Sequence, residues 1–135
     1  MSVGVLILSH TGIGSSLLGT AMHMLTDSTL AIKLLSIERD SDPGEVIEHT
    51  KLLIEELDCG DGVLILTDLY GSTACNITTA SVTSENISAV SGLNLSTLIR
   101  ILNYPEASLA ELVDKAIRGG KEGIKQIKSS TNHAN

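Results

Sequence analysis

Two continuous apolar runs stand out along the chain. Residues 3–9 read VGVLILS and residues 63–67 read VLILT. A strand that is buried on both faces of a sheet shows continuous rather than alternating apolarity, so both runs predict central strands. Shorter runs at residues 31–37 (AIKLLSI) and 86–91 (NISAVS) predict two further strands.

The stretches between these runs show apolar residues at helical spacing. Three of them begin with helix-start signals: Asp42 followed by Pro43, then Asn94, then Ser108. The pattern predicts helices over about residues 15–26, 43–57, 73–84, 95–102 and 109–119.

This alternation of strands and helices predicts an α/β fold in one domain. A mostly parallel sheet with helices on both faces gives three layers, α/β/α, and we expect the strand order 2-1-3-4. Residues 124–128 (IKQIK) fit either a last strand or a frayed helix. We therefore predict a domain over residues 1–128 and a flexible tail over residues 129–135.

Candidate chemistry lies where the first and third strands end. In an open parallel sheet, ligands bind beyond the carboxyl ends of the strands, where the strand order reverses. His10 ends the first apolar run and Asp68 follows the third strand. Neighbouring strands lie about 4.8 Å apart, so the two side chains can meet. A carboxylate on one imidazole nitrogen orients the ring and leaves the other nitrogen as a nucleophile for a transient phosphoryl group.

The loops after these strands contain residues suited to hold a phosphoryl group. Gly12 precedes one helix, and Gly71, Ser72 and Thr73 lead into another. Helix N-termini offer free N–H groups to anions, while glycine permits close approach and hydroxyls donate hydrogen bonds. We expect at least one of Ser72 and Thr73 to serve only as a cap of this helix. Neither loop contains Lys or Arg, which fits a group that is passed on rather than retained.

Composition and charge narrow the classes of function. The chain of 135 residues has a formal net charge of −7 and two aromatic residues, both Tyr. An acidic chain poor in aromatics is not expected to bind nucleic acid. Cys59 and Cys75 show no metal-ligand spacing, so we expect free thiols in a reducing cytoplasm, without metal or cofactor. We expect neither a signal peptide nor a membrane span.

Three motifs together resemble a known family. These are VGVLILSH, DGVLILTDLYGSTACN (residues 61–76) and VSGLNLSTL (residues 90–98). They resemble the IIA domain of the mannose/fructose/sorbose-type family of the bacterial phosphoenolpyruvate-dependent sugar phosphotransferase system. The resemblance spans about residues 3–124. The matching positions are Asp61, Gly62, Thr67, Asp68, Leu69, Gly71, Thr73, Asn76, Gly92, Asn94 and Leu95.

The resemblance implies a phosphotransferase component. His10 would accept a phosphoryl group from the phosphohistidine carrier protein, and a IIB component would receive it, with Asp68 orienting His10. The resemblance also implies a homodimer that exchanges an antiparallel C-terminal strand, which would account for residues 124–128. No IIB segment follows, so we expect a free-standing cytoplasmic component that meets the membrane only peripherally, through a permease.

Three departures from the family pattern keep alternatives open. Thr11 and Ser72 stand where the family usually has Gly, and Ala74 stands where it usually has Pro. The alternatives are the phosphotransfer subunit of dihydroxyacetone kinase, a purely regulatory phosphorelay protein, and a non-catalytic flavodoxin-like binding module.

Overall fold

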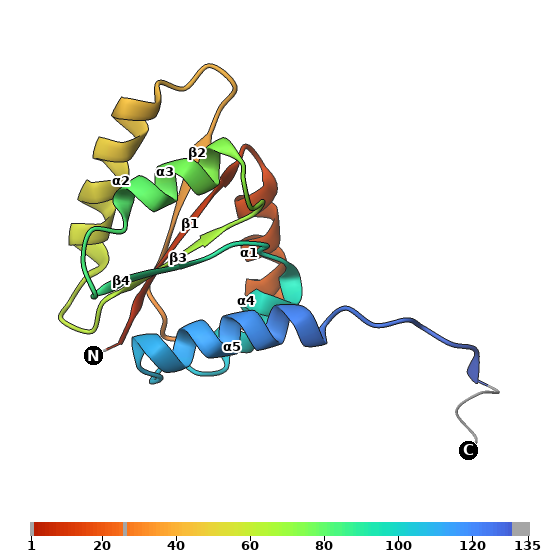
Figure 1. The fold of residues 1–135 in the computed structure, drawn as a ribbon. Helices are drawn as coiled ribbons and strands as arrows, with labels where there is room; N and C mark the ends of the chain where they lie inside the picture. Colours follow the sequence, from red (N-terminus) through yellow and green to blue (C-terminus); the bar gives the residue numbers. More distant parts are fainter. Residues whose placement is uncertain (1, 26, 131–135) are drawn as a thin grey trace.

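A four-stranded parallel sheet forms the centre of the protein in the computed structural model, which describes residues 2–25 and 27–130. The strands are β1 (Gly4–His10), β2 (Ile32–Ile37), β3 (Val63–Thr67) and β4 (Ile87–Val90). Their order is β2-β1-β3-β4, and every neighbouring pair is parallel (Figure 1). The predicted strand order is confirmed.

The two continuous apolar runs are the two inner strands. All of β3 is buried, and so is β1 up to its last residue, whereas the edge strands β2 and β4 are only partly buried. The register sets Leu8 beside Thr67 and His10 beside Ile37. The carboxyl ends of β1, β2 and β3 therefore lie at the same edge of the sheet. The sequence predicts the candidate chemistry at this edge.

Five helices of the described chain cover the two faces of the sheet (Figure 1). On one face lie α2 (Pro43–Leu57) and α3 (Thr73–Ser81). On the other lie α1 (Ile13–Met24), α4 (Leu95–Leu102) and α5 (Leu109–Glu122). The predicted three-layer α/β/α architecture is confirmed.

Each face of the sheet has its own apolar core. Val5 and Ile7 of β1 belong to the core on the α1, α4 and α5 side, whereas Leu6 and Leu8 belong to the core beneath α2 and α3. Successive side chains of a strand point to opposite faces. Ser9 therefore faces α1, and His10 faces the side of α2 and α3.

Two of the three predicted helix caps, Asn94 and Ser108, form capping hydrogen bonds, and the third, Asp42, does not. The side chain of Asn94 accepts a hydrogen bond from the N–H of Thr97, and Ser108 forms a capping box with Glu111. Asp42 occupies the N-cap position of α2, with Pro43 next to it, but its carboxylate accepts no capping hydrogen bond.

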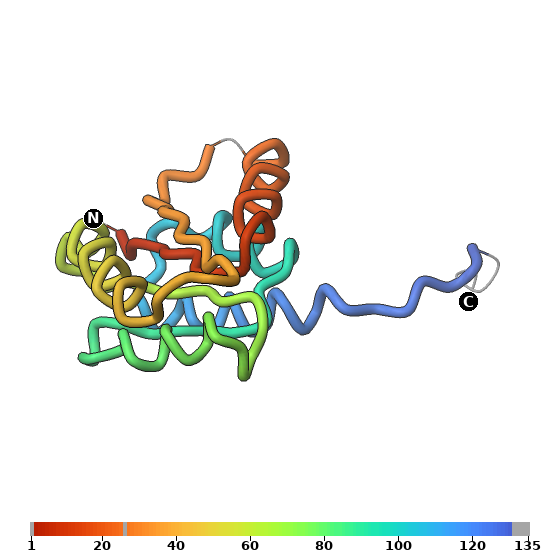
Figure 2. The backbone as a smooth tube through the Cα atoms, turned by 90° about the horizontal axis from the view of Figure 1, so that it is seen from above, coloured from red at the N-terminus to blue at the C-terminus, as the bar shows by residue number. Residues whose placement is uncertain are grey.

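The segment after α5 differs from both alternatives that the sequence offers. Residues 124–129 are exposed and form neither strand nor helix. In Figures 1 and 2 the segment runs away from the body of the protein, so it does not approach its own sheet. A strand forms only where its backbone can hydrogen-bond to a neighbouring strand, and this segment lies beside none in the described chain. Residues 131–135 of the predicted tail lie outside the described residues.

Candidate functional site

His10 and Asp68 are in direct contact across the ends of β1 and β3. Nδ1 of His10 lies 2.9 Å from Oδ2 of Asp68, and the backbone N–H of His10 donates to the same oxygen at 3.0 Å. The carboxylate thus holds both the ring and the backbone of His10. This double contact fixes the direction of the imidazole at the edge of the sheet.

The two side chains differ sharply in exposure. The His10 side chain is 43% exposed, whereas that of Asp68 is 7% exposed. Burial raises the pKa of Asp68, but the hydrogen bonds and charge of His10 outweigh it, so the pKa lies below its ordinary 3.8. The carboxyl group is ionised at neutral pH and only accepts hydrogen bonds. Nδ1 therefore donates to it, and when the ring is neutral the lone pair is on the other nitrogen, Nε2.

The second oxygen of Asp68 is unpaired. Within the described residues, Oδ1 is buried and has no hydrogen-bond partner, and the same holds for Oγ1 of Thr67. Buried polar atoms without partners are rare in folded proteins. All hydrogen bonds of the Asp68 carboxylate to the described residues therefore go through Oδ2 to His10.

Ser9 anchors the loop that follows His10. Its hydroxyl, buried inside the protein, donates to the His10 carbonyl at 3.1 Å and accepts from the N–H of Gly14 at 3.0 Å. It thereby replaces a side-chain cap that Gly12, the N-cap residue of α1, cannot supply. A Cβ on Gly14 would lie 2.7 Å from the Ser9 hydroxyl, so only glycine fits there. A hydroxyl inside an otherwise apolar strand was the available signal in the sequence.

Two glycines shape the loops at the site. Gly12 has a backbone φ of 86° and Gly71 has a φ of 81°, values that residues with a Cβ rarely adopt. Thr11, which stands where the resembled family usually has Gly, takes an ordinary backbone conformation. Its hydroxyl donates to the carbonyl of Ile37 at 3.3 Å and so links the loop after β1 to the end of β2.

Ser72 and Thr73 have different surroundings at the start of α3. The Ser72 hydroxyl accepts from the N–H of Cys75 at 3.3 Å and donates its proton to the Leu69 carbonyl at 2.6 Å. Ser72 therefore caps the helix, with its one hydroxyl proton in use. Thr73 is exposed and lines the same cavity as His10.

This open cavity, of about 660 Å³, lies between the ends of β1 and β2 and the start of α3. Besides His10, Thr11 and Thr73, its lining includes Glu38 and Arg39 from the loop between β2 and α2. The loops after β1 and β3, where the sequence predicts the chemistry, have no basic residue. Arg39 was not predicted, because only the pairing of β2 with β1 shows that a third loop lies beside His10.

The comparison with protein families agrees with this geometry. A family model described as the fructose IIA component of the phosphotransferase system, EIIA-man, matches residues 4–117. The chain belongs to this family. The EIIA-man match includes His10, Asp68 and both loops around them. The resemblance of the three sequence motifs to the mannose-type IIA family is therefore confirmed.

Individual relatives cover nearly the whole chain. The mannose-specific EIIAB component of Escherichia coli (strain K12) is 27% identical over 132 residues, which are 96% of this chain and 41% of that protein. The chain thus spans about two fifths of the length of this relative.

Solved structures show the same fold. The mannose/sorbose specific IIA subunit from Enterococcus faecalis superposes with a TM-score of 0.83 at 21% identity, over 96% of this chain and 97% of that chain. The EIIA component from Streptococcus agalactiae gives 0.76 at 26% identity, over 92% and 96% of the two chains.

Two other kinds of site are absent from the described residues. None of the helices in residues 2–25 and 27–130 has both the length and the apolar character needed to cross a membrane. The same residues contain no group of three or more His, Cys, Asp or Glu side chains arranged to hold a metal ion.

Proposed function

We propose that Nε2 of His10 accepts a phosphoryl group from the phosphohistidine carrier protein and passes it to a IIB component. The contact between His10 and Asp68 is the observation that carries the proposal. It leaves Nε2 with its lone pair on a ring that is 43% exposed, so a second protein can reach it.

The proposed chemistry follows from the position of the proton. The Nε2 lone pair forms a bond to phosphorus while the bond between phosphorus and the donor nitrogen breaks. The proton on Nδ1 stays beside Asp68, so the phosphorylated ring is cationic and the carboxylate stabilises it. A cationic ring is also a good leaving group, which suits onward transfer to the IIB component.

The phosphoryl oxygens would be bound by the starts of α1 and α3. Gly12 and Gly71 allow the backbone to approach, and Thr73 offers a hydroxyl and an N–H at a helix N-terminus. We assign Ser72 to the same phosphoryl-binding loop. Because its hydroxyl proton is donated to Leu69, its contribution there is to hold the loop in shape.

Intact mass measurement tests this function directly. The chain is incubated with phosphoenolpyruvate, enzyme I and the phosphohistidine carrier protein, and its mass is compared before and after treatment with acid. We expect the gain of one phosphoryl group, lost again in acid, as a phosphorus–nitrogen bond requires. No gain, or a gain that survives acid, would contradict the proposal.

We further propose a homodimer in which the two copies exchange their C-terminal segments. Ile124 and Ile127 are 78% and 94% exposed in the single chain. The outer edge of β4 has no strand beside it in the described chain, and a cavity of about 420 Å³ lined by Val82 and Val90 lies next to it. An apolar segment from a second copy would cover this edge.

Removing residues 124–135 is expected to convert the dimer to a monomer, because the exchanged segment supplies the contact with β4. Light scattering after size-exclusion chromatography measures the change in mass. The variant Lys128→Ala, which alters the same segment but keeps Ile124 and Ile127, is the matched control and should stay dimeric. A truncated chain that remains a dimer would refute the exchange.

A further inference from the structure

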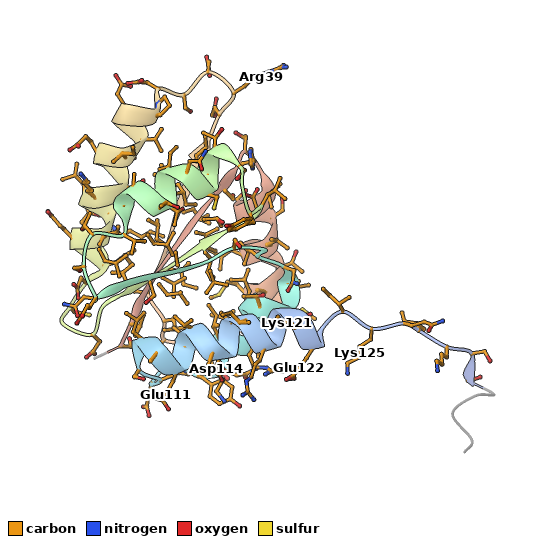
Figure 3. The ribbon with its side chains drawn as sticks, viewed as in Figure 1. Arg39, Glu111, Asp114, Lys121, Glu122 and Lys125 are labelled. Carbon is orange, nitrogen blue, oxygen red and sulfur yellow. The ribbon has the colours of Figure 1, made fainter. Side chains whose placement is uncertain are left out.

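Arg39 projects from a hydrogen-bonded turn at the edge of the His10 cavity. The turn between β2 and α2 is closed by the N–H of Glu38, which donates to the Ser41 hydroxyl at 2.9 Å, and the N–H of Ser41, which donates to the Glu38 carbonyl at 3.1 Å. Figure 3 shows Arg39 at the outer end of this turn, with its side chain extending away from the protein body.

The register of the sheet places this turn close to His10. His10 lies opposite Ile37, and Arg39 is two residues further along. Neighbouring strands lie about 4.8 Å apart, so Ile37 lies directly beside His10, and the turn begins at the next residue. Both residues line the same cavity, so the long Arg39 side chain can reach His10 by turning inward from the orientation in Figure 3.

Arg39 differs from the other arginines in its pairing. Arg100 is bonded to Glu122, and Arg118 is bonded to Asp114. Arg39 is exposed and makes no ion pair or side-chain hydrogen bond within residues 2–25 and 27–130. Its guanidinium group is therefore available to an anion at His10.

We propose that Arg39 binds the oxygens of the phosphoryl group while it is transferred to Nε2 of His10. This inference rests on the proposed function and adds a residue to it. The guanidinium group carries several N–H donors in one plane, a geometry that matches phosphoryl oxygens. It stabilises the charge on these oxygens as one phosphorus–nitrogen bond forms and the other breaks.

Arg39 is a positive charge in a loop whose other charged residues are acidic. Glu38, Asp40 and Asp42 lie in the same loop, and Glu38 lines the cavity. Their carboxylates repel an incoming phosphoryl group. Replacing Arg39 with a neutral residue removes the attraction and leaves this repulsion unbalanced, so the rate should respond strongly.

Phosphoramidate, a small phosphoryl donor without a protein surface, separates phosphoryl contact from partner docking. Its phosphorus–nitrogen bond breaks and ammonia leaves, while Nε2 of His10 forms the new bond and Nδ1 keeps its proton. The labelling rate of full-length wild-type and variant chains is followed by intact mass. We expect Arg39→Gln to lower the rate about ten-fold, the effect of losing one hydrogen bond to a charged group, and Arg39→Lys to recover part of it.

The matched control is Arg118→Gln, an exposed arginine on α5 whose replacement should leave the rate unchanged. A wild-type rate in Arg39→Gln would overturn the role of Arg39, and so would a loss confined to the carrier protein as donor. Both results leave the proposed function intact. Absence of His10 labelling in the wild-type chain with either donor would instead reject the proposed function.

Discussion

His10→Ala is expected to abolish phosphorylation by the phosphohistidine carrier protein, to below the limit of detection by intact mass. No other described side chain combines a free imidazole nitrogen with a bonded carboxylate at the carboxyl edge of the sheet. Removing a nucleophile removes the covalent step itself. The loss should therefore be complete rather than graded.

The fold of this variant should be retained. The His10 side chain is partly exposed, and the backbone N–H of residue 10 still donates to Asp68 after the ring is removed. Circular dichroism and thermal unfolding check this point. His49→Ala, which removes an exposed histidine on α2, is the matched control and should be labelled like the wild type. Labelling that persists in His10→Ala would refute His10 as the acceptor.

Asp68→Asn is expected to slow phosphoryl transfer by about ten- to a hundred-fold, the range found when a carboxylate that orients a metal-binding imidazole is lost. The amide keeps the shape of the side chain and one acceptor oxygen. It lacks the negative charge that holds the proton on Nδ1 and stabilises the cationic ring. Rapid-quench measurement of the labelling rate gives the size of the effect.

The exposed Asp61→Asn supplies a control with the same chemical change outside the site and should keep the wild-type rate. Equal rates in Asp68→Asn and the wild type would remove Asp68 from the mechanism.

The same substitution has a pH-dependent effect on stability. The pKa of Asp68 is lowered in the folded protein, so the unfolded chain binds its proton more readily. The stabilisation from Asp68 is fully present above its ordinary value of 3.8 and is lost as the pH falls through the lower, folded pKa. Urea unfolding should therefore show a difference between wild type and Asp68→Asn at neutral pH that narrows below about pH 4.

The local sequence predicts most of the elements because short-range chemistry determines them. The continuous apolar runs of β1 and β3 can only be buried on both faces of a sheet, so their central place followed directly. Asn94 and Ser108 cap their helices through groups three residues away. The helix ends were less exact, since α3 stops at Ser81 rather than Ser84.

Only part of the site could be predicted from the sequence. The sequence by itself determined that His10 and Asp68 end two strands, and the alternation of elements placed those strands side by side. Their 2.9 Å contact, the second bond from the His10 backbone and the buried Asp68 oxygen depend on packing between residues 58 positions apart. No local pattern encodes such distances.

Other assignments were decided only by the tertiary structure. Ser72 had two candidate roles, and its proton is used by Leu69 because the loop folds back on itself. Arg39 lines the His10 cavity because β2 pairs in register with β1, and this pairing brings a third loop to the site. The sequence thus determined the elements and the pair of reactive residues. The tertiary structure decided which charges and donors surround them, because those neighbours are set by the order and register of the strands.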